Sequence, residues 1–319
     1  MCIRDSLTTG VKYGVSVPNS DQSFVDEVYK KVKSGAISFE QPSNCLLYTS
    51  GAARRARRGS GLTRYAIVSD IHSNLESLQH AFTLIDESDT LVSLGDVVGY
   101  GASPNEVIDR TRSLGNIFVR GNHDKAATGL IDLEDFNPMA ATSALWTRDQ
   151  LTAEHHEWLY ALPQGPLSLE GFPEANLVHG SPGDEDVYIV SIGDALVPLL
   201  ALPTPLTFFG HTHLQGGFFA DDNSADGFRP EYRTVGQAES ISLQLKQDTR
   251  YLINPGSVGQ PRDGDWRAAF ALFDTEAHLI NFHRVPYNLK AAQDRIPVSY
   301  THLDVYKRQA QALIPPARL

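Results

Sequence analysis

Five short blocks of polar residues recur along the chain, each at or near the end of a short apolar run. In order they are Asp70-Ile71-His72, Gly95-Asp96, Gly121-Asn122-His123-Asp124, Val178-His179-Gly180 and Gly210-His211-Thr212-His213. Carboxylate, amide and imidazole groups are ligands that divalent transition metals take in proteins. The blocks supply enough of them for two metal ions, with one histidine to spare. A pair of such ions hydrolyses phosphate esters with a metal-bound hydroxide.

Two ions at a short separation need a ligand in common, and a carboxylate with two oxygens is suited to that role. We expect Asp96 to be the bridge, because the preceding Gly95 lets the backbone pass close to the ions. Asp70 and His72 alternate along what should be an extended segment, so their side chains should emerge on one side. The remaining candidate ligands are Asn122, His179, His211 and His213, the last two repeating the same spacing.

The first three blocks each follow a predicted strand. The strands are Tyr65–Ser69, Thr90–Leu94 and Asn116–Val119, with helical patterns at Leu75–Asp86 and from Ser103 onward. Strands that alternate with helices favour right-handed parallel units. In open sheets of that kind, ligands bind beyond the carboxyl ends of the strands. The first three blocks should therefore meet at one edge of a sheet.

The pattern changes after two more predicted helices, Phe136–Gln150 and Thr152–Ala161. From Leu162 onward, short strands separated by Gly, Asp and Asn turns predict a second, largely antiparallel sheet packed on the first. One of these predicted strands covers residues 232–235, and the hydrophilic segment Asp221–Gly227 is predicted to be a surface loop. The expected fold class is α/β, a four-layer αββα sandwich of two mixed β-sheets flanked by helices.

Both ends of the chain resemble translated sequencing adapters. Four segments (residues 2–6, 45–50, 298–303 and 304–309) can be back-translated into one transposon-end string or its reverse complement. We therefore expect residues 1–61 to be an artefactual or disordered N-terminal extension and residues 298–319 a C-terminal tail of the same kind. Residues 62–297 are then the functional domain, of a length that suits one α/β unit.

Charge and cysteine content limit the partners of this domain. The chain has 27 Lys and Arg against 38 Asp and Glu; the two terminal segments hold 12 and 6 of these, which leaves a net charge of −17 on residues 62–297. Such a surface repels polyanions, so we do not expect nucleic acid to be a partner. Both cysteines, Cys2 and Cys45, lie in the adapter-like segments, so disulfides and thiolate ligands are not expected. No apolar run of about 20 residues predicts a membrane span, and we expect a cytoplasmic protein.

Taken in order, the five blocks resemble the motifs of the calcineurin-like metallophosphoesterases: Asp-x-His, Gly-Asp, Gly-Asn-His-Asp/Glu, His and Gly-His-x-His. The likeness spans nearly all of residues 62–297, and residues 254–263 resemble a loop of the small bacterial and archaeal phosphodiesterase branch. The resemblance implies one metal on Asp70, His72, Asp96 and His213, and a second on Asp96, Asn122, His179 and His211. It also implies that His123 donates a proton to the leaving group or stabilises the transition state, with Asp124 orienting it.

The expected function is that of a dinuclear metal-dependent phosphoesterase, which hydrolyses a phosphodiester or phosphomonoester by attack of a metal-bridging hydroxide. The ligand set fits two divalent ions, Mn²⁺ first, with Fe, Ni²⁺ or Zn²⁺ also suitable. The substrate should be a small phosphorylated molecule, with nucleotides among the candidates. Arg262 and Arg120 are candidate phosphate contacts, and Tyr100 is a candidate base-stacking residue.

Two alternatives stay open on the sequence. One is a protein Ser/Thr phosphatase or a dinucleoside tetraphosphate hydrolase on the same scaffold. The other is a metal-bearing scaffold that binds partners without catalysis.

Overall fold

The computed structural model describes residues 30, 34, 64–86 and 89–299. The two predicted terminal segments lie outside the described residues, apart from residues 30, 34, 298 and 299. Within the described part of the chain, no helix is both long and apolar enough to span a bilayer.

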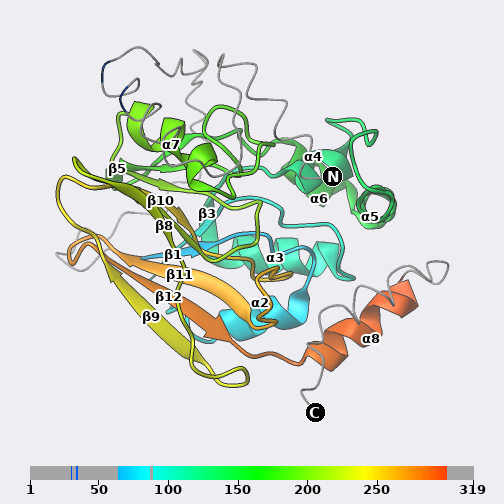
Figure 1. Cartoon of the computed structure of the whole chain (residues 1–319). Helices are drawn as coiled ribbons and strands as arrows, with labels where there is room; N and C mark the ends of the chain where they lie inside the picture. The colour runs from blue at the N-terminus through cyan, green and yellow to red at the C-terminus, as the bar shows by residue number, and fades with distance from the viewer. Residues whose placement is uncertain (1–29, 31–33, 35–63, 87–88, 300–319) are drawn as a thin grey trace.

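One six-stranded sheet carries the first three blocks (Figure 1). Its strand order is β3 (Gly115–Phe118), β2 (Thr90–Ser93), β1 (Arg64–Val68), β11 (Ala268–Asp274), β12 (Leu279–Val285) and β9 (Glu239–Gln244). Strands β1, β2 and β3 pair in parallel, whereas β11, β12 and β9 extend the sheet from β1 by antiparallel pairing.

A second six-stranded sheet carries the last two blocks. Its order is β4 (Leu167–Leu169), β5 (Phe172–Leu177), β6 (Leu206–Phe208), β10 (Arg250–Asn254), β7 (Gly216–Ala220) and β8 (Ala225–Phe228). The pairs β5–β6 and β6–β10 are parallel, and the other pairs are antiparallel.

The two sheets pack face to face with helices outside. Alternate residues of β1 point to opposite faces: Ile67 packs with Phe208 in the core between the sheets, and Val68 packs with Leu78 under the helices. Helices α2 (Leu75–Ala81) and α3 (Pro104–Leu114) pack on the first sheet, and α7 (Ile192–Ala201) packs on the second. The predicted four-layer sandwich of two mixed sheets is confirmed.

Four further helices complete the described structure. Helices α4 (Asn122–Thr128), α5 (Pro138–Gln150) and α6 (Ala153–Tyr160) form a group in which α4 contacts both others. Helix α8 (Leu289–Ser299) packs on α2. In Figure 1 the group α4–α6 and helix α8 stand at the same side of the sandwich, with a gap in the ribbon between them.

The prediction of a largely antiparallel second sheet built from all later strands was wrong. Three of those strands, β9, β11 and β12, join the first sheet, and the second sheet is mixed. The reason is visible in β11, where six consecutive residues are buried. A strand that is apolar on both faces needs cover on both, and the central place beside β1 supplies it.

Two local predictions were also wrong. The segment Asp221–Gly227 is not all loop, because β8 begins at Ala225 and pairs with β7, which leaves Phe228 packed against the core between the sheets. Residues 232–235 form no strand. In this region the backbone is bound by a buried arginine and not by a neighbouring strand. Arg267 donates to the backbone oxygen of Gln237 at 2.6 Å.

Candidate metal centre

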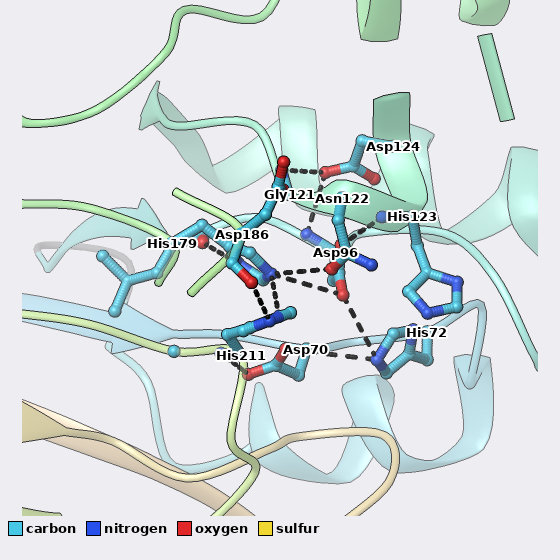
Figure 2. Close-up of polar contacts among 12 residues, drawn as sticks. Asp70, His72, Asp96, Gly121, Asn122, His123, Asp124, His179, Asp186 and His211 are labelled. Atoms are coloured by element: carbon cyan, nitrogen blue, oxygen red, sulfur yellow. Dashed lines mark hydrogen bonds and ion pairs between the residues drawn. The ribbon is translucent and has the colours of Figure 1, made fainter. Parts of the chain in front are cut away.

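The five blocks follow strands of both sheets. Asp70, Asp96 and Asn122 come after β1, β2 and β3, and His179 and His211 come after β5 and β6. Since each of these sets of strands is parallel, their carboxyl ends lie together. The facing of the two sheets then brings both sets of ends to one place (Figure 2).

One group of ligand atoms comes from Asp70, His72, Asp96 and His213, and these atoms all lie within 4.8 Å of one another. The Nε2 atoms of His72 and His213 are 3.1 Å apart. His213 Nε2 lies 3.3 Å from Asp70 Oδ1, and His72 Nε2 lies 3.6 Å from Asp96 Oδ2. All four side chains are buried, so water does not compete freely for these atoms.

A second group shares Asp96 with the first and adds His179 and His211, again within 4.8 Å. His179 Nε2 lies 3.4 Å from Asp96 Oδ2 and 3.1 Å from His211 Nδ1. The amide oxygen of Asn122 lies 3.3 Å from the same His179 nitrogen. The structure thus brings all seven candidate ligands together, with Asp96 between the two groups.

The four histidines of these groups all turn their second ring nitrogen to a backbone carbonyl. The pairs are His72 Nδ1 with Val98 O at 3.1 Å, His179 Nδ1 with Leu94 O at 2.8 Å, His211 Nε2 with Asp186 O at 3.1 Å, and His213 Nδ1 with Gln260 O at 2.6 Å. A carbonyl oxygen only accepts, so each of these nitrogens carries the hydrogen. In the neutral ring, the nitrogen that faces the cluster is then a lone pair, as in metal-binding histidines.

Two carboxylate oxygens complete a set of acceptors. Asp70 Oδ1 and Asp96 Oδ2 are buried and have no hydrogen-bond partner among the described residues. Their sister oxygens are held by backbone N–H groups, Asp70 Oδ2 by His211 at 3.1 Å and Asp96 Oδ1 by His123 at 2.8 Å. Buried charge without a partner is costly. Lone pairs that converge in this way fit divalent cations, one in each group.

Protons compete for the same lone pairs. Burial raises the pKa of Asp70 to about 7, although the charge of His179 opposes it. Burial lowers the pKa of His179, but the charge of Asp96 and its contact outweigh burial and raise that pKa to about 10. Burial lowers the pKa of His72 and of His213 well below the ordinary value. Cation binding at neutral pH therefore displaces protons from the cluster.

The backbone of the ligands is strained. Positive φ angles occur at Asp70 (53°), His72 (49°), Asp96 (53°), His211 (66°) and His213 (61°). The left-handed region costs a non-glycine residue roughly 1–2 kcal/mol, so this clustering is typical of a functional site. It also corrects the prediction that residues 70–72 and 211–213 are extended. Each strand ends before its block, and the turns are fixed by bonds such as His72 N to Asp96 O at 3.0 Å.

The family model of the calcineurin-like phosphoesterase superfamily domain matches residues 64–278. The chain belongs to this superfamily. An uncharacterized protein of Methanocaldococcus jannaschii is 34% identical over 236 residues, which cover 72% of this chain and 90% of that protein. The crystal structure of a metallophosphoesterase from Sphaerobacter thermophilus is 35% identical, with a TM-score of 0.65 over 80% of this chain and all (100%) of that one. A hypothetical protein from Pyrococcus horikoshii, 18% identical with a TM-score of 0.57, covers 77% of this chain and 96% of its own and shows the same fold.

In this phosphoesterase, His123 lies beside His72 of the first ligand group and belongs to neither group (Figure 2). Its ring centroid is 4.9 Å from that of His72, at an interplanar angle of 82°. The side chain is 5% exposed, and its Nδ1 atom has no hydrogen-bond partner among the described residues. Burial lowers the pKa of His123 to about 4, which favours a neutral ring.

Asp124 ties two of the blocks together through the backbone. Its carboxylate accepts the N–H groups of Asp96 at 2.8 Å, Gly121 at 3.0 Å and Val98 at 3.2 Å. Burial, together with the charge of Asp96, raises the pKa of Asp124 to about 7. Both carboxylate oxygens accept backbone N–H groups, so Asp124 ties the start of α4 to the turn that carries Asp96.

A cavity of about 930 Å³ opens onto the phosphoesterase centre, with His72, Asn122, His123 and His211 among its lining residues. Two of the three predicted substrate contacts, Arg262 and Tyr100, also line it. The Tyr100 ring lies 4.5 Å from the His123 ring, measured between centroids. The third predicted contact, Arg120, is not among the lining residues. Its guanidinium binds Glu185 at 2.8 Å and Gln164 at 3.0 Å.

Three residues near the phosphoesterase centre escaped the sequence reasoning. Tyr188 stacks on His211 at 3.8 Å between ring centroids, and Asp186 supplies the carbonyl that fixes the tautomer of His211. Buried Lys125 holds the Asp186 carboxylate at 2.6 Å. The position of Lys125 directly after the third block could have identified it from the sequence as a residue near the site. Tyr188 had none, because its contact depends on how residues 180–188 fold back.

Proposed function

We propose that this phosphoesterase hydrolyses phosphodiesters or phosphomonoesters of small molecules at a centre of two divalent cations, with Mn²⁺ the first candidate. The observation that carries the proposal is the convergence of four imidazole nitrogens and two carboxylate oxygens that have no hydrogen-bond partner among the described residues. One cation would be held by Asp70, His72, Asp96 and His213. The other would be held by Asp96, Asn122, His179 and His211.

A bound cation pair lowers the pKa of a coordinated water and offsets charge on the phosphate. The protein's own residues then orient the ester. Asp96 keeps the two sites adjacent, because its Oδ2 lies within 3.6 Å of a histidine from each group. His123 borders the cavity as a neutral ring, which suits hydrogen-bond donation to an oxygen that gains charge in the transition state.

Arg262 is the proposed phosphate contact. It is the sole Arg or Lys among the described residues that line the cavity. Its Nη2 atom binds Gln260 Oε1 at 2.9 Å, which orients the guanidinium beside the residue whose carbonyl holds His213. A planar guanidinium binds two phosphate oxygens at once. We assign Arg262 to the non-bridging oxygens and Tyr100 to the wall beside His123.

The test uses the full chain loaded with Mn²⁺, Fe²⁺, Ni²⁺ or Zn²⁺. We expect turnover of bis(4-nitrophenyl) phosphate or of 4-nitrophenyl phosphate with at least one metal, and no comparable turnover of a phosphopeptide. Asp96→Asn should lose most of both metals, since the two groups share that carboxylate. Asp109→Asn is the matched control, because the Asp109 side chain is 68% exposed and lies outside both groups.

Two results would overturn the proposal. If no metal supports turnover of any of these esters, the chain is a binding scaffold. If Asp96→Asn retains two metals per chain by elemental analysis, the assignment of Asp96 as the common ligand is wrong.

A further inference from the structure

The cavity is asymmetric in charge. Arg262 is its one positive side chain among the described residues, whereas the segment between α4 and α5 contributes Asp132, Glu134 and Asp135. These three carboxylates are exposed and form no ion pair within the described part of the chain. The other acidic lining residues are balanced.

The two other acidic residues that line the cavity each form an ion pair with a basic side chain. Glu76 faces Arg295 at 3.1 Å, and Asp186 faces Lys125 at 2.6 Å. Neither therefore adds much negative potential to the cavity. The unbalanced charge comes from the 132–135 carboxylates, which we call the acidic wall.

The acidic wall lines the same cavity as the candidate metal ligands His72, Asn122 and His211. Phe136, which follows Asp135 directly, packs its ring edge-on against His123 at 5.3 Å between centroids. His123 is 5% exposed, lines the same cavity and has an unpartnered ring nitrogen. An ester that contacts His123 therefore occupies a cavity whose lining also includes Phe136 and the acidic wall.

The charges in the cavity discriminate among substrates. The phosphate that reacts is offset by the cation pair and by Arg262. A second phosphate further along the substrate would meet carboxylates without a counter-ion, and each such pair costs a factor of roughly 3 to 10 in binding at the dielectric of a protein surface. A neutral or cationic arm carries no such cost.

We propose that the site selects phosphodiesters whose arms carry no phosphate beyond the reacting one, and that the acidic wall is the specificity-determining element. This inference rests on the proposed function. It names the substrate class as monoanionic or zwitterionic diesters and disfavours polyphosphates such as dinucleoside tetraphosphates.

Three diesters with one leaving group test the proposal. They are 4-nitrophenyl phosphocholine, thymidine 5′-(4-nitrophenyl phosphate) and the same thymidine compound with a 3′-phosphate. We expect kcat/KM to be at least tenfold lower for the 3′-phosphate compound than for its unphosphorylated twin. The choline ester should equal or exceed the unphosphorylated thymidine ester.

The acidic wall is then neutralised in the variant Asp132→Asn/Glu134→Gln/Asp135→Asn. The expected result is a three- to tenfold smaller gap between the two thymidine compounds. The control variant is Glu174→Gln/Glu231→Gln/Glu276→Gln, which changes the net charge equally at exposed positions that do not line the cavity. Its gap should stay within twofold of the wild-type value. Added salt should shrink the wild-type gap, since screening acts over about 10 Å at 0.1 M.

Binding of the products gives a second readout. Thymidine 5′-monophosphate and thymidine 3′,5′-bisphosphate are titrated into the metal-loaded chain by calorimetry, and we expect the bisphosphate to bind more weakly in the wild type only. Equal gaps in the wild type and the neutralised variant, in rate or in product binding, overturn the inference. Loss of all turnover with preserved charge selection in product binding overturns the proposed function and shows charge selection in the cavity by itself.

Discussion

The His123 ring touches His72, Tyr100 and Phe136, yet it belongs to neither ligand group. Removing it should therefore damage chemistry and spare the cations. For His123→Ala we expect kcat to fall by about 10²–10³-fold, the loss typical of one donor aimed at developing charge. The metal content should stay near the wild-type value.

Elemental analysis and steady-state kinetics of the same preparation check this prediction. A His123→Asn variant is a useful companion because asparagine keeps a side-chain hydrogen-bond donor. Its smaller side chain also fits the position, where Gly99 packs directly against the His123 ring. Full activity in His123→Ala would show that another group stabilises the leaving oxygen.

Metal binding at the centre should release protons. Asp70, with its pKa raised to about 7, and His179, with its pKa raised to about 10, hold protons that a cation must displace. Affinity should therefore rise as the pH is raised toward 7, and the Asp70 contribution should then level off. We expect about two protons released per chain at pH 6 and about one at pH 8.5.

Calorimetry in buffers of different ionisation enthalpy measures this release. An affinity that is flat from pH 5.5 to 8, with no buffer dependence, would contradict the protonation described for Asp70. Residue type and order were enough to predict that these seven candidate ligands converge, because few side chains bind such metals. The tautomers were beyond the sequence, since they depend on carbonyls such as Leu94 O and Gln260 O that approach only in the folded chain.

At the scale of elements, two positively charged side chains near the start of α4 hold the segment of residues 180–188 in place. Lys125 contacts Glu185 at 2.9 Å and Asp186 at 2.6 Å, and Arg120 contacts Glu185 at 2.8 Å. This segment supplies the carbonyl that fixes His211. We expect Lys125→Met to lower the affinity for the metal ion at His179 and His211 at least tenfold and to lower thermal stability.

Metal titration followed by elemental analysis distinguishes the two sites in that variant. Lys290→Met is the control, because the Lys290 side chain is 78% exposed in an ordinary helical pair with Asp294. If Lys125→Met binds both cations as the wild type does, the segment of residues 180–188 is held in place without this lysine.

Strand β12 carries a histidine, His283, that makes the stability of the fold depend on pH. His283 stacks on Phe270 of β11 at 4.9 Å between centroids, and burial, aided by the charge of Arg64, lowers its pKa from 6.5 to about 4. The folded state thus resists a proton that the unfolded state accepts. The stabilisation is complete above pH 6.5 and is lost as the pH falls toward 4. At pH 5 the loss is about 2 kcal/mol.

Urea unfolding of the wild type and of His283→Phe at pH 5 and pH 7.5 checks this sign. The phenylalanine variant should lose less stability than the wild type on acidification, whereas His80→Phe, at an exposed position on α2, should behave as the wild type. Identical pH dependence in all three chains would rule out His283 as the source.

Element types were predictable where local chemistry decides them. Ser103 and Pro104 predicted the start of α3, which the structure confirms. Helix α7 was missed although Ser191 and Asp194 form a capping box, because short strands were expected throughout that region. Sheet membership could not be predicted for β9, β11 and β12, since periodicity says that a strand is buried and not which neighbour buries it.

At the scale of the whole molecule, the cations should act as ligands of the folded state alone. The ligands come from both sheets, so unfolding abolishes the site. At a free metal concentration of about a thousand times Kd, binding contributes about 4 kcal/mol. For a domain of this size we expect a chelator to lower Tm by about 10 °C.

Differential scanning fluorimetry with EDTA, followed by return of Mn²⁺ in excess, measures this effect. Asp96→Asn should show little response to either addition. A wild-type Tm that ignores the chelator would mean that protons alone satisfy the buried acceptors.

Two histidines of the first ligand group face each other but lie far apart in the sequence. This separation has a consequence for biosynthesis. His72 and His213 are separated by 141 positions, and between them lie all the elements from α2 to β6. A nascent polypeptide that has left the ribosome only as far as β3 offers an incomplete chelator. Ion loading must therefore follow, and cannot guide, the early stages of translation.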